Sequence, residues 1–221
     1  MGVHSDRFIS INRRDYDLII SNPPVQPWLY TDMANQQQRG QAAAWNEAGA
    51  DGRLVLDSVL QEAMHYLKVG GRLITSTTSR HGHRRTQSLL NQHWFNQWRE
   101  IYRAEHACIQ DYHGPYLQSW LAMQAQDLDL RVYQKDREGR PFAFYTDPNG
   151  QASLITLRGD TPIRWQPQDG QWCAVAGSSS VIPPLHDEEI QALQADAQQS
   201  EWYYQYCLIE MEKTECQLQA A

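Results

Sequence analysis

Short apolar runs alternate with amphipathic stretches along the first half of this 221-residue chain. The branched run Leu18–Ile20 ends at Asn22-Pro23-Pro24, which predicts a strand buried on both faces of a parallel sheet and then a stiff turn. From Leu56 to Leu67 apolar residues recur at three- and four-residue steps, so we expect an amphipathic helix that ends at Gly70-Gly71. Residues 72–77 then predict a second strand. Strands that alternate with helices indicate an α/β fold.

The rest of the chain is predicted to be richer in strands. Two turn sequences, Asp136 to Gly139 and Asp147 to Gly150, predict hairpins. The apolar residues Ile190, Leu193 and Met211 belong to a stripe with helical spacing, which predicts a helix near the carboxyl terminus. The other expected elements are helices over 86–95 and 117–125, strands over 98–109, 128–134, 141–146 and 152–157, and a ribbon within 164–175.

Composition narrows the class of protein. The net charge of −7 disfavours a nucleic-acid partner, because nucleic-acid binders usually carry a basic stripe. No apolar run approaches the length of a membrane span and no signal peptide is visible, so we expect a cytoplasmic protein without a membrane partner. The four cysteines lie far apart and indicate reduced thiols, and no metal site is predicted.

One stretch, Arg80 to Arg85, concentrates basic and histidine side chains. Its simplest interpretation is a solvated loop before a helix. The alternative is a contact with an acidic or phosphate-bearing substrate, since the loop follows a predicted parallel strand.

The turn after Leu18–Ile20 suggests chemistry. Open α/β sheets bind ligands at the carboxyl ends of their strands, where Asn22 offers a side-chain carbonyl and Pro23 a backbone carbonyl. Two acceptors on a rigid loop can hold both hydrogens of a planar –NH2 group and orient its nitrogen. The competing interpretation is a purely structural Asn-Pro turn.

The run Asp17 to Pro24, D-L-I-I-S-N-P-P, resembles the strand-four motif of class I S-adenosylmethionine-dependent methyltransferases that act on amide or amino nitrogen. It is most similar to release-factor glutamine methyltransferases and to small-domain guanine-N2 rRNA methyltransferases, whose motif reads N-P-P-[Y/F]. Residues 51–74 also resemble the helix and strand five of these enzymes. The resemblance implies a Rossmann-like sheet and methyl transfer from S-adenosylmethionine.

By this resemblance Asn22, Pro23 and Pro24 form the catalytic loop, and the acceptor is a planar group of protein glutamine, a nucleobase or a small molecule. Protein glutamine is slightly favoured because the chain is acidic. Val25 stands where the family has an aromatic ring, and Trp28 is expected to supply the missing surface. Val25 and Trp28 are therefore the expected substrate-binding residues.

The segment Ser5-Asp6-Arg7-Phe8 resembles the motif that follows strand three in the same enzymes. The resemblance implies that Asp6 contacts the adenine amino group of S-adenosylmethionine. Phe8 and Asn22 are the other expected cofactor-binding residues.

The Gly-rich turn that binds the methyl donor in this family is not found before residue 5 or among the later glycines. We therefore expect the carboxyl-terminal half of a truncated or split enzyme, which binds S-adenosylmethionine weakly or not at all by itself. The expected partners are a companion chain or upstream half that carries the Gly-rich motif, or a second copy in a homo-oligomer. The alternative is a non-catalytic binding or interaction module derived from a methyltransferase.

The expected organisation has four segments. Residues 1–135 form a methyltransferase-like α/β half-domain with only the later strands of the sheet, and residues 136–177 form a β-rich extension. Residues 178–186 are an expected linker, and residues 187–217 an expected C-terminal helix.

Overall fold

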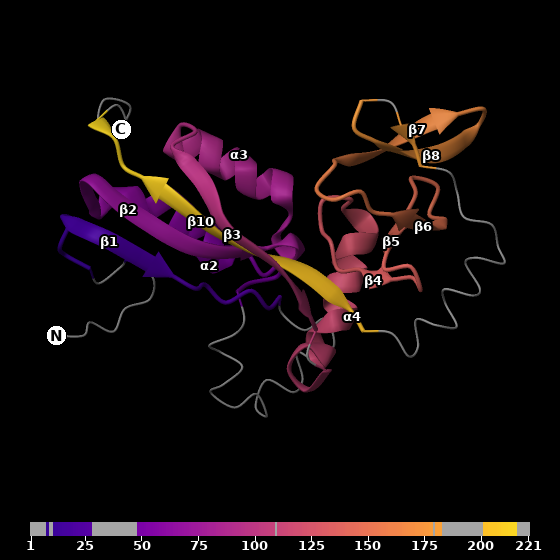
Figure 1. The fold of residues 1–221 in the computed structure, drawn as a ribbon, viewed down its shortest axis with the longest axis horizontal. Helices are drawn as coiled ribbons and strands as arrows, with labels where there is room; N and C mark the ends of the chain where they lie inside the picture. Colours follow the sequence, from indigo (N-terminus) through magenta and orange to yellow (C-terminus); the bar gives the residue numbers. More distant parts are fainter. Residues whose placement is uncertain are drawn as a thin grey trace. The chain divides into compact units, whose positions relative to one another are not determined.

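The computed structural model describes residues 8, 11–27, 48–108, 110–178, 180–182 and 201–215 (Figure 1). They form a mixed α/β structure with two compact units. The first unit comprises residues 1–104 and 206–221, and the second comprises residues 105–205. The expected boundary at residue 135 therefore differs from the division in the structure, since residues 105–135 belong to the second unit.

The first unit contains a four-stranded sheet with the order β1-β2-β10-β3. Strand β1 (Tyr16–Ser21) pairs in parallel with β2 (Leu67–Thr78). Strand β10 (Tyr203–Glu212) runs antiparallel to β2, and β3 (Trp98–Ala107) lies at the far edge. Both β3 and β10 continue into the second unit.

Helices connect these strands as the sequence predicts. Helix α2 (Leu54–Glu62) and a 3₁₀ turn at Ala63–His65 lie between β1 and β2. After β2, a second 3₁₀ turn at Ser79–His81 leads into α3 (His83–Trp94). The expected helices and strands from residue 54 to residue 107 are thus confirmed, with shifts of a few residues at their ends.

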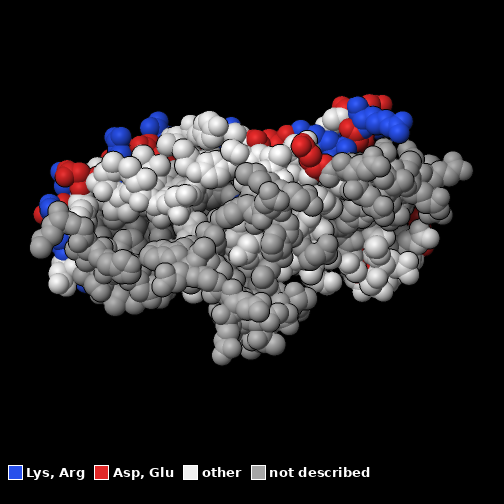
Figure 2. All heavy atoms as spheres, turned by 90° about the horizontal axis from the view of Figure 1, so that it is seen from below, with Lys and Arg blue, Asp and Glu red and all other residues white. Residues whose placement is uncertain are grey.

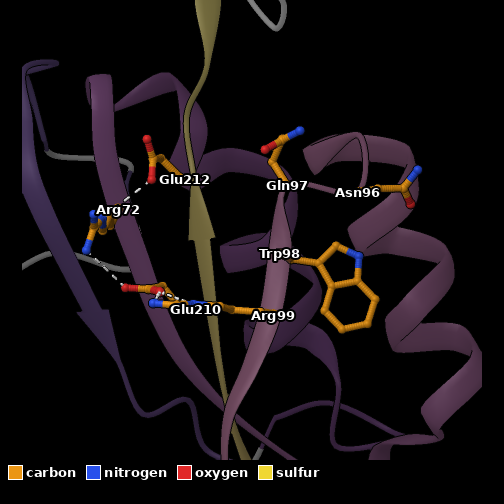
Figure 3. Close-up of a pocket in the computed structure, with 7 residues that line it drawn as sticks. All are labelled: Arg72, Asn96, Gln97, Trp98, Arg99, Glu210 and Glu212. Atoms are coloured by element: carbon orange, nitrogen blue, oxygen red, sulfur yellow. Dashed lines mark hydrogen bonds and ion pairs between the residues drawn. The ribbon is translucent and has the colours of Figure 1, made fainter.

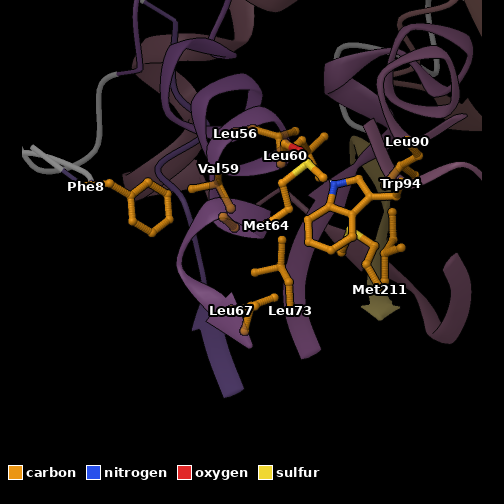
Figure 4. Close-up of a cluster of buried hydrophobic side chains, with 12 residues drawn as sticks. Phe8, Leu56, Val59, Leu60, Met64, Leu67, Leu73, Leu90, Trp94 and Met211 are labelled. Carbon is orange, nitrogen blue, oxygen red and sulfur yellow. Dashed lines mark hydrogen bonds between the residues drawn. The ribbon is translucent and has the colours of Figure 1, made fainter. Parts of the chain in front are cut away.

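One hydrophobic core holds the first unit together (Figure 4). Both α2 and α3 contribute to it, and Trp94 of α3 is fully buried, with its indole Nε1 donating to the Leu60 carbonyl at 2.7 Å. The sheet contributes side chains from β2 and β10. The buried members are Phe8, Leu56, Val59, Leu60, Ala63, Met64, Leu67, Leu73, Leu90, Trp94, Ile209 and Met211.

The glycine pair Gly70-Gly71 lies within β2 and does not end a helix, which corrects the expectation. The pairing of β1 with β2 shifts register between Tyr16 and Leu18, at the level of this pair. A β-carbon on Gly71 would approach the Tyr16 carbonyl oxygen to 2.7 Å, so only glycine permits this close strand contact.

The predicted C-terminal helix is wrong where the structure describes it, because residues Tyr203–Glu212 form strand β10. The side chains of Cys207, Ile209 and Met211 alternate into the core, with a strand period of two residues. Pairing with β2 determines this conformation, with Ile209 opposite Thr75. Residues 187–200 lie outside the described residues.

The second unit is built from helix α4 (Gln110–Gln126) and two small antiparallel sheets. One sheet contains β4 (Gln134–Lys135), β5 (Pro141–Thr146) and β6 (Ala152–Thr156), and the other contains β7 (Ile163–Gln168), β8 (Gln171–Ala176) and β9 (Ser180–Val181). Side chains from both sheets share one core.

The two predicted hairpins and the ribbon in this unit are confirmed. The expected strand over 128–134 is limited to β4 and a single bridge at Tyr133. Part of the expected linker at 178–186 is strand β9, which pairs with β8. Of that linker, residues 179 and 183–186 lie outside the described residues.

Strand β1 is not buried on both faces, contrary to the prediction. It lies at the edge of the sheet, where Leu18 is 47% exposed and Ile20 is 72% exposed. Ile19 points to the opposite face and packs against the core. The exposed branched side chains therefore lie beside an edge backbone that another strand can pair with.

This edge predicts self-association or pairing with a companion. At high concentration the chain is expected to form oligomers in sedimentation velocity experiments. Ile20→Lys should shift it toward monomer, because a charge on an edge strand opposes strand addition. Leu54→Lys adds the same charge at another exposed apolar position and should change little. A wild-type chain that stays monomeric at high concentration would refute this prediction.

Candidate functional site

The Asn22-Pro23-Pro24 turn lies at the carboxyl end of β1, directly after its last residue, Ser21. That residue pairs with Thr75 in the parallel strand β2. Pro23 is buried while Asn22 is exposed. The sequence therefore places a polar side chain, on a rigid turn, at the edge of the sheet where ligands of α/β proteins bind.

The Asn22 side chain is held by a partner on the neighbouring strand. The Ser76 hydroxyl donates a hydrogen bond of 2.6 Å to Oδ1 of Asn22. A carbonyl oxygen has two acceptor lone pairs, so one remains available. Among the described residues, no donor reaches the Pro23 carbonyl. The exposed Asn22 oxygen thus keeps one acceptor site, and the second carbonyl expected to bind an –NH2 group belongs to the buried Pro23.

Gly52 supports the turn from the segment that precedes α2. Its φ of +72° lies in the left-handed region, and a β-carbon there would lie 2.5 Å from the Val25 carbonyl oxygen and 3.4 Å from the Pro27 nitrogen. The loop and the start of α2 therefore touch backbone to backbone at Gly52.

The Gly52→Ala variant is expected to be more destabilised than Gly70→Ala. Both glycines have positive φ, and alanine costs about 1–2 kcal/mol in that region. Gly70 has open space around it, whereas Gly52 meets the loop, so the clash should add about 1–3 kcal/mol. Urea unfolding gives the free energy of unfolding of both variants. Equal losses of stability would show that the loop moves aside and relieves the clash.

His81 lies in the 3₁₀ turn after β2 and is 1% exposed. Its Nδ1 accepts a 3.2 Å hydrogen bond from the backbone N–H of Thr78, so the neutral ring carries its proton on Nε2. Burial lowers the pKa of His81 well below its usual value, and the positive charges of Arg53 and Arg80 lower this pKa further. The folded chain therefore holds a neutral imidazole beside the site.

Because of His81, stability is expected to fall as pH falls below about 6.5, the ordinary histidine pKa. Below that pH the unfolded chain binds a proton that the folded chain resists, so the free energy of unfolding decreases. One pH unit lower, His81 alone should cost about 1.4 kcal/mol.

The control for this pH dependence is His81→Gln, which keeps an acceptor for the Thr78 N–H but does not titrate. Urea unfolding at pH 7.5 and 5.5 should show a smaller loss for this variant than for the wild type. Identical losses would mean that His81 takes up a proton without unfolding.

A buried arginine ties the two helices to the same turn. Arg53, 1% exposed, donates from Nη1 to the His81 carbonyl and to Oγ1 of Thr86, and it pairs with Asp57 at 2.7 Å. Burial lowers the pKa of Arg53, although Asp57 opposes this change. Asp57 also accepts from Arg85, at 2.7 Å. The loop after β2 is therefore anchored by charge-assisted hydrogen bonds.

Two polar groups near the loop are buried without a hydrogen-bond partner. The side-chain amide of Gln26, 1% exposed, has neither donor nor acceptor satisfied, and Nε2 of His81 also makes no hydrogen bond. The Gly52 backbone lies close enough to favour a proton on His81, but it does not complete a hydrogen bond. Unsatisfied buried polar groups are rare, and a water or ligand group commonly satisfies them.

The structure brings together only part of the predicted site. Asn22, Pro23, Pro24 and Val25 lie on one turn. Phe8 packs in the core, where its ring stacks on Tyr66 with centroids 4.6 Å apart, and this position gives it a structural role. The other predicted contacts, Asp6 and Trp28, lie outside the described residues.

Sequence reasoning missed Ser76, Gly52 and Gln26, and the solvated-loop interpretation is wrong for Arg80 and His81. Both basic side chains are buried, at 4% and 1% exposure. A usable signal was present: Thr75-Ser76-Thr77-Thr78 is a polar run within a predicted buried strand. All four residues are buried, and buried hydroxyl groups at a strand's carboxyl end indicate a polar site.

Two surface hollows lie elsewhere, and Asn22 lines neither of them. In the first, Arg72 pairs with Glu210 and Glu212, and Glu210 also pairs with Arg99 (Figure 3). In the second, Asp51 and Asp57 pair with Arg85. In the first hollow the two arginines and the two glutamates balance one another, whereas the second keeps an excess of carboxylates over the single Arg85. On the face shown in Figure 2, blue and red side chains likewise lie side by side.

No protein-family model matches this chain, and comparison with curated proteins finds no match. None of the helices among the described residues combines the length and apolar character needed to span a bilayer. Within the same residues, no group of three or more His, Cys, Asp or Glu side chains could hold a metal ion. In the described part of the chain, Cys108, Cys173 and Cys207 form no disulfide.

Proposed function

We propose that this chain supplies the acceptor-binding part of an S-adenosylmethionine-dependent N-methyltransferase with a Rossmann-like sheet. One observation carries the proposal. The exposed Asn22 stands at the carboxyl ends of two parallel strands, with its side-chain carbonyl hydrogen-bonded to Ser76, and Pro23 follows it directly in the chain. This arrangement suits a planar amide or amino group, whose two hydrogens need two acceptors.

The turn would act by orientation. Two hydrogen bonds from the acceptor nitrogen to Asn22 and Pro23 hold its plane and direct its lone pair away from the turn. Both acceptors are neutral, so neither serves as a strong base. The proton that the nitrogen loses on methylation then passes to solvent. S-adenosylmethionine, when bound, supplies the electrophilic methyl group.

The sequence contains no G-x-G turn of the kind that binds the donor in the enzymes it resembles. Phe8 packs in the core, and the described glycines lie in turns, in the β2 bulge and, in the case of Gly114, within helix α4. We therefore propose that a companion polypeptide with a Gly-rich strand-to-helix turn holds the donor. The exposed edge of β1 is the place where the strands of such a companion would pair.

The acceptor class favoured by charge is a protein glutamine. The chain has a net charge of −7, and its described acidic and basic side chains form ion pairs at several places. Such a surface gives little attraction to a polyanion, which disfavours RNA and DNA. A small-molecule amide is the remaining alternative, because Val25 offers no ring for stacking.

The experiment is a calorimetric titration with S-adenosylhomocysteine, with and without the companion, followed by methyl transfer to a glutamine-containing peptide. The proposal expects weak or no binding to the chain alone, and both binding and transfer in the mixture. Low-micromolar binding to the chain alone would contradict the need for a companion. Binding in the mixture without transfer to any amide or amino acceptor would contradict the function.

A second candidate is a non-catalytic interaction module. The exposure of Leu18 and Ile20 on an edge strand favours it, since such a surface suits strand pairing with another protein. This candidate predicts that a partner binds through β1 while Asn22 variants behave as wild type. Methyl transfer that depends on Asn22 would exclude it.

A further inference from the structure

We propose that Ser76 is the positioning residue for Asn22, which rests on the proposed function of the Asn22 turn. The two residues are 54 positions apart in the sequence, yet the Ser76 hydroxyl donates to Asn22 Oδ1 at 2.6 Å. Ser76 is 1% exposed whereas Asn22 is exposed, so a buried hydroxyl holds an exposed amide.

Strand pairing on both sides restrains the backbone of Ser76. On one side of β2, Thr75 pairs with Ser21, the residue before Asn22. On the other side, Ser76 itself pairs with Leu208 of β10. The hydroxyl is thus presented from the interior of a sheet, which is the rigid kind of support that a functional side chain requires.

This hydrogen bond is made by the carbonyl end of the Asn22 amide. An asparagine amide can rotate and exchange its carbonyl acceptor for its –NH2 donor. In the orientation present here Ser76 donates to Oδ1, and it leaves the same oxygen a second lone pair for the acceptor nitrogen. It also polarises the carbonyl, since hydrogen bonds in series strengthen one another. The loss of this hydroxyl should weaken the binding of the acceptor –NH2 group by Asn22 without abolishing it.

The test uses the ¹⁵N-labelled chain and N-acetylglutamine amide as the probe, with binding followed by NMR. Ser76→Ala is expected to weaken probe binding about fivefold, the effect of one neutral hydrogen bond. Ser76→Thr keeps a hydroxyl and should restore binding to within about twofold. In an Asn22→Ala background, Ser76→Ala should have no further effect, because it acts through Asn22.

Ser58→Ala is the matched control, since Ser58 is also buried and its hydroxyl donates to Glu62 in α2, away from the turn. The side-chain amide resonances of Asn22 should shift in Ser76→Ala and stay in place in Ser58→Ala. Unchanged Asn22 resonances, or additive effects of the two alanine substitutions, would overturn the role of Ser76. Equal probe binding by the wild type and Asn22→Ala, or no binding by the wild type, would instead overturn the proposed function.

Discussion

Asn22→Ala is expected to lower methyl transfer by about 10²-fold in the mixture with the companion, without change in donor affinity. Alanine removes the side-chain acceptor, and the loss of one positioning contact commonly has an effect of this size. The fold should persist, because Pro23 and Pro24 still define the turn. The measurement is turnover at saturating donor, together with donor affinity by calorimetry.

Asn91→Ala is the control for this prediction. Its side chain accepts a hydrogen bond from Trp98 Nε1 at 2.9 Å, so the same substitution removes a comparable contact outside the Asn22 turn. It should leave turnover unchanged. If Asn22→Ala stays within about twofold of the wild type in an active mixture, the turn is structural and the functional proposal fails.

Asp57→Ala is expected to destabilise the fold by about 3 kcal/mol or more. The substitution leaves the Arg53 guanidinium buried at 1% exposure without the carboxylate that pairs with it at 2.7 Å. It also removes one of the two carboxylates that hold Arg85. Urea unfolding gives the free energy directly.

Two further variants test whether the loss of stability comes from the charge of Asp57 and from the burial of its ion pair. Asp57→Asn keeps an acceptor oxygen for Arg53 and should lose less stability than Asp57→Ala. Glu212→Ala breaks an exposed ion pair with Arg72 and should cost less than about 1 kcal/mol. If Asp57→Ala lowers the free energy of unfolding no more than Glu212→Ala does, water or another group satisfies Arg53 in the variant. The buried Arg53–Asp57 pair is then not essential for stability.

Local signals predicted local structure well. In the β5–β6 hairpin, Asp147 Oδ1 accepts from the backbone N–H groups of Asn149 and Gln151, and Gly150 has a φ of +84°. These contacts need only neighbouring residues, so the sequence pattern was sufficient to identify the turn. The same reasoning succeeded for α2, whose apolar spacing matches its buried side.

Long-range pairing accounts for the main error. The segment around Tyr204, Leu208 and Met211 has helical spacing, but it also contains the alternation Cys207, Ile209 and Met211. The choice between the two periods depends on β2, and one contact between them joins Arg72 to Glu210, which are 138 residues apart. Sequence spacing alone does not carry that information.

In the candidate site too, local features could be predicted from the sequence and long-range contacts could not. The Asn22 turn and its place after a strand could be predicted, because prolines and a branched run mark it locally. The donors and neighbours that give it a defined geometry come from elsewhere in the chain, such as Ser76 after α2 and Gly52 before it. Their roles appear only when β1 and β2 pair.

The position of β10 also has a consequence for folding on the ribosome. The ladder between β2 and β10 cannot form until residue 212 has left the exit tunnel, long after β1, α2 and β2 have emerged. The whole of residues 105–205 is translated in the interval and can fold first. During that time β2 lacks its neighbour on that side, and closure of so long a loop is slow. Nascent chains stalled before β10 are therefore the form most exposed to misassembly and to capture by chaperones.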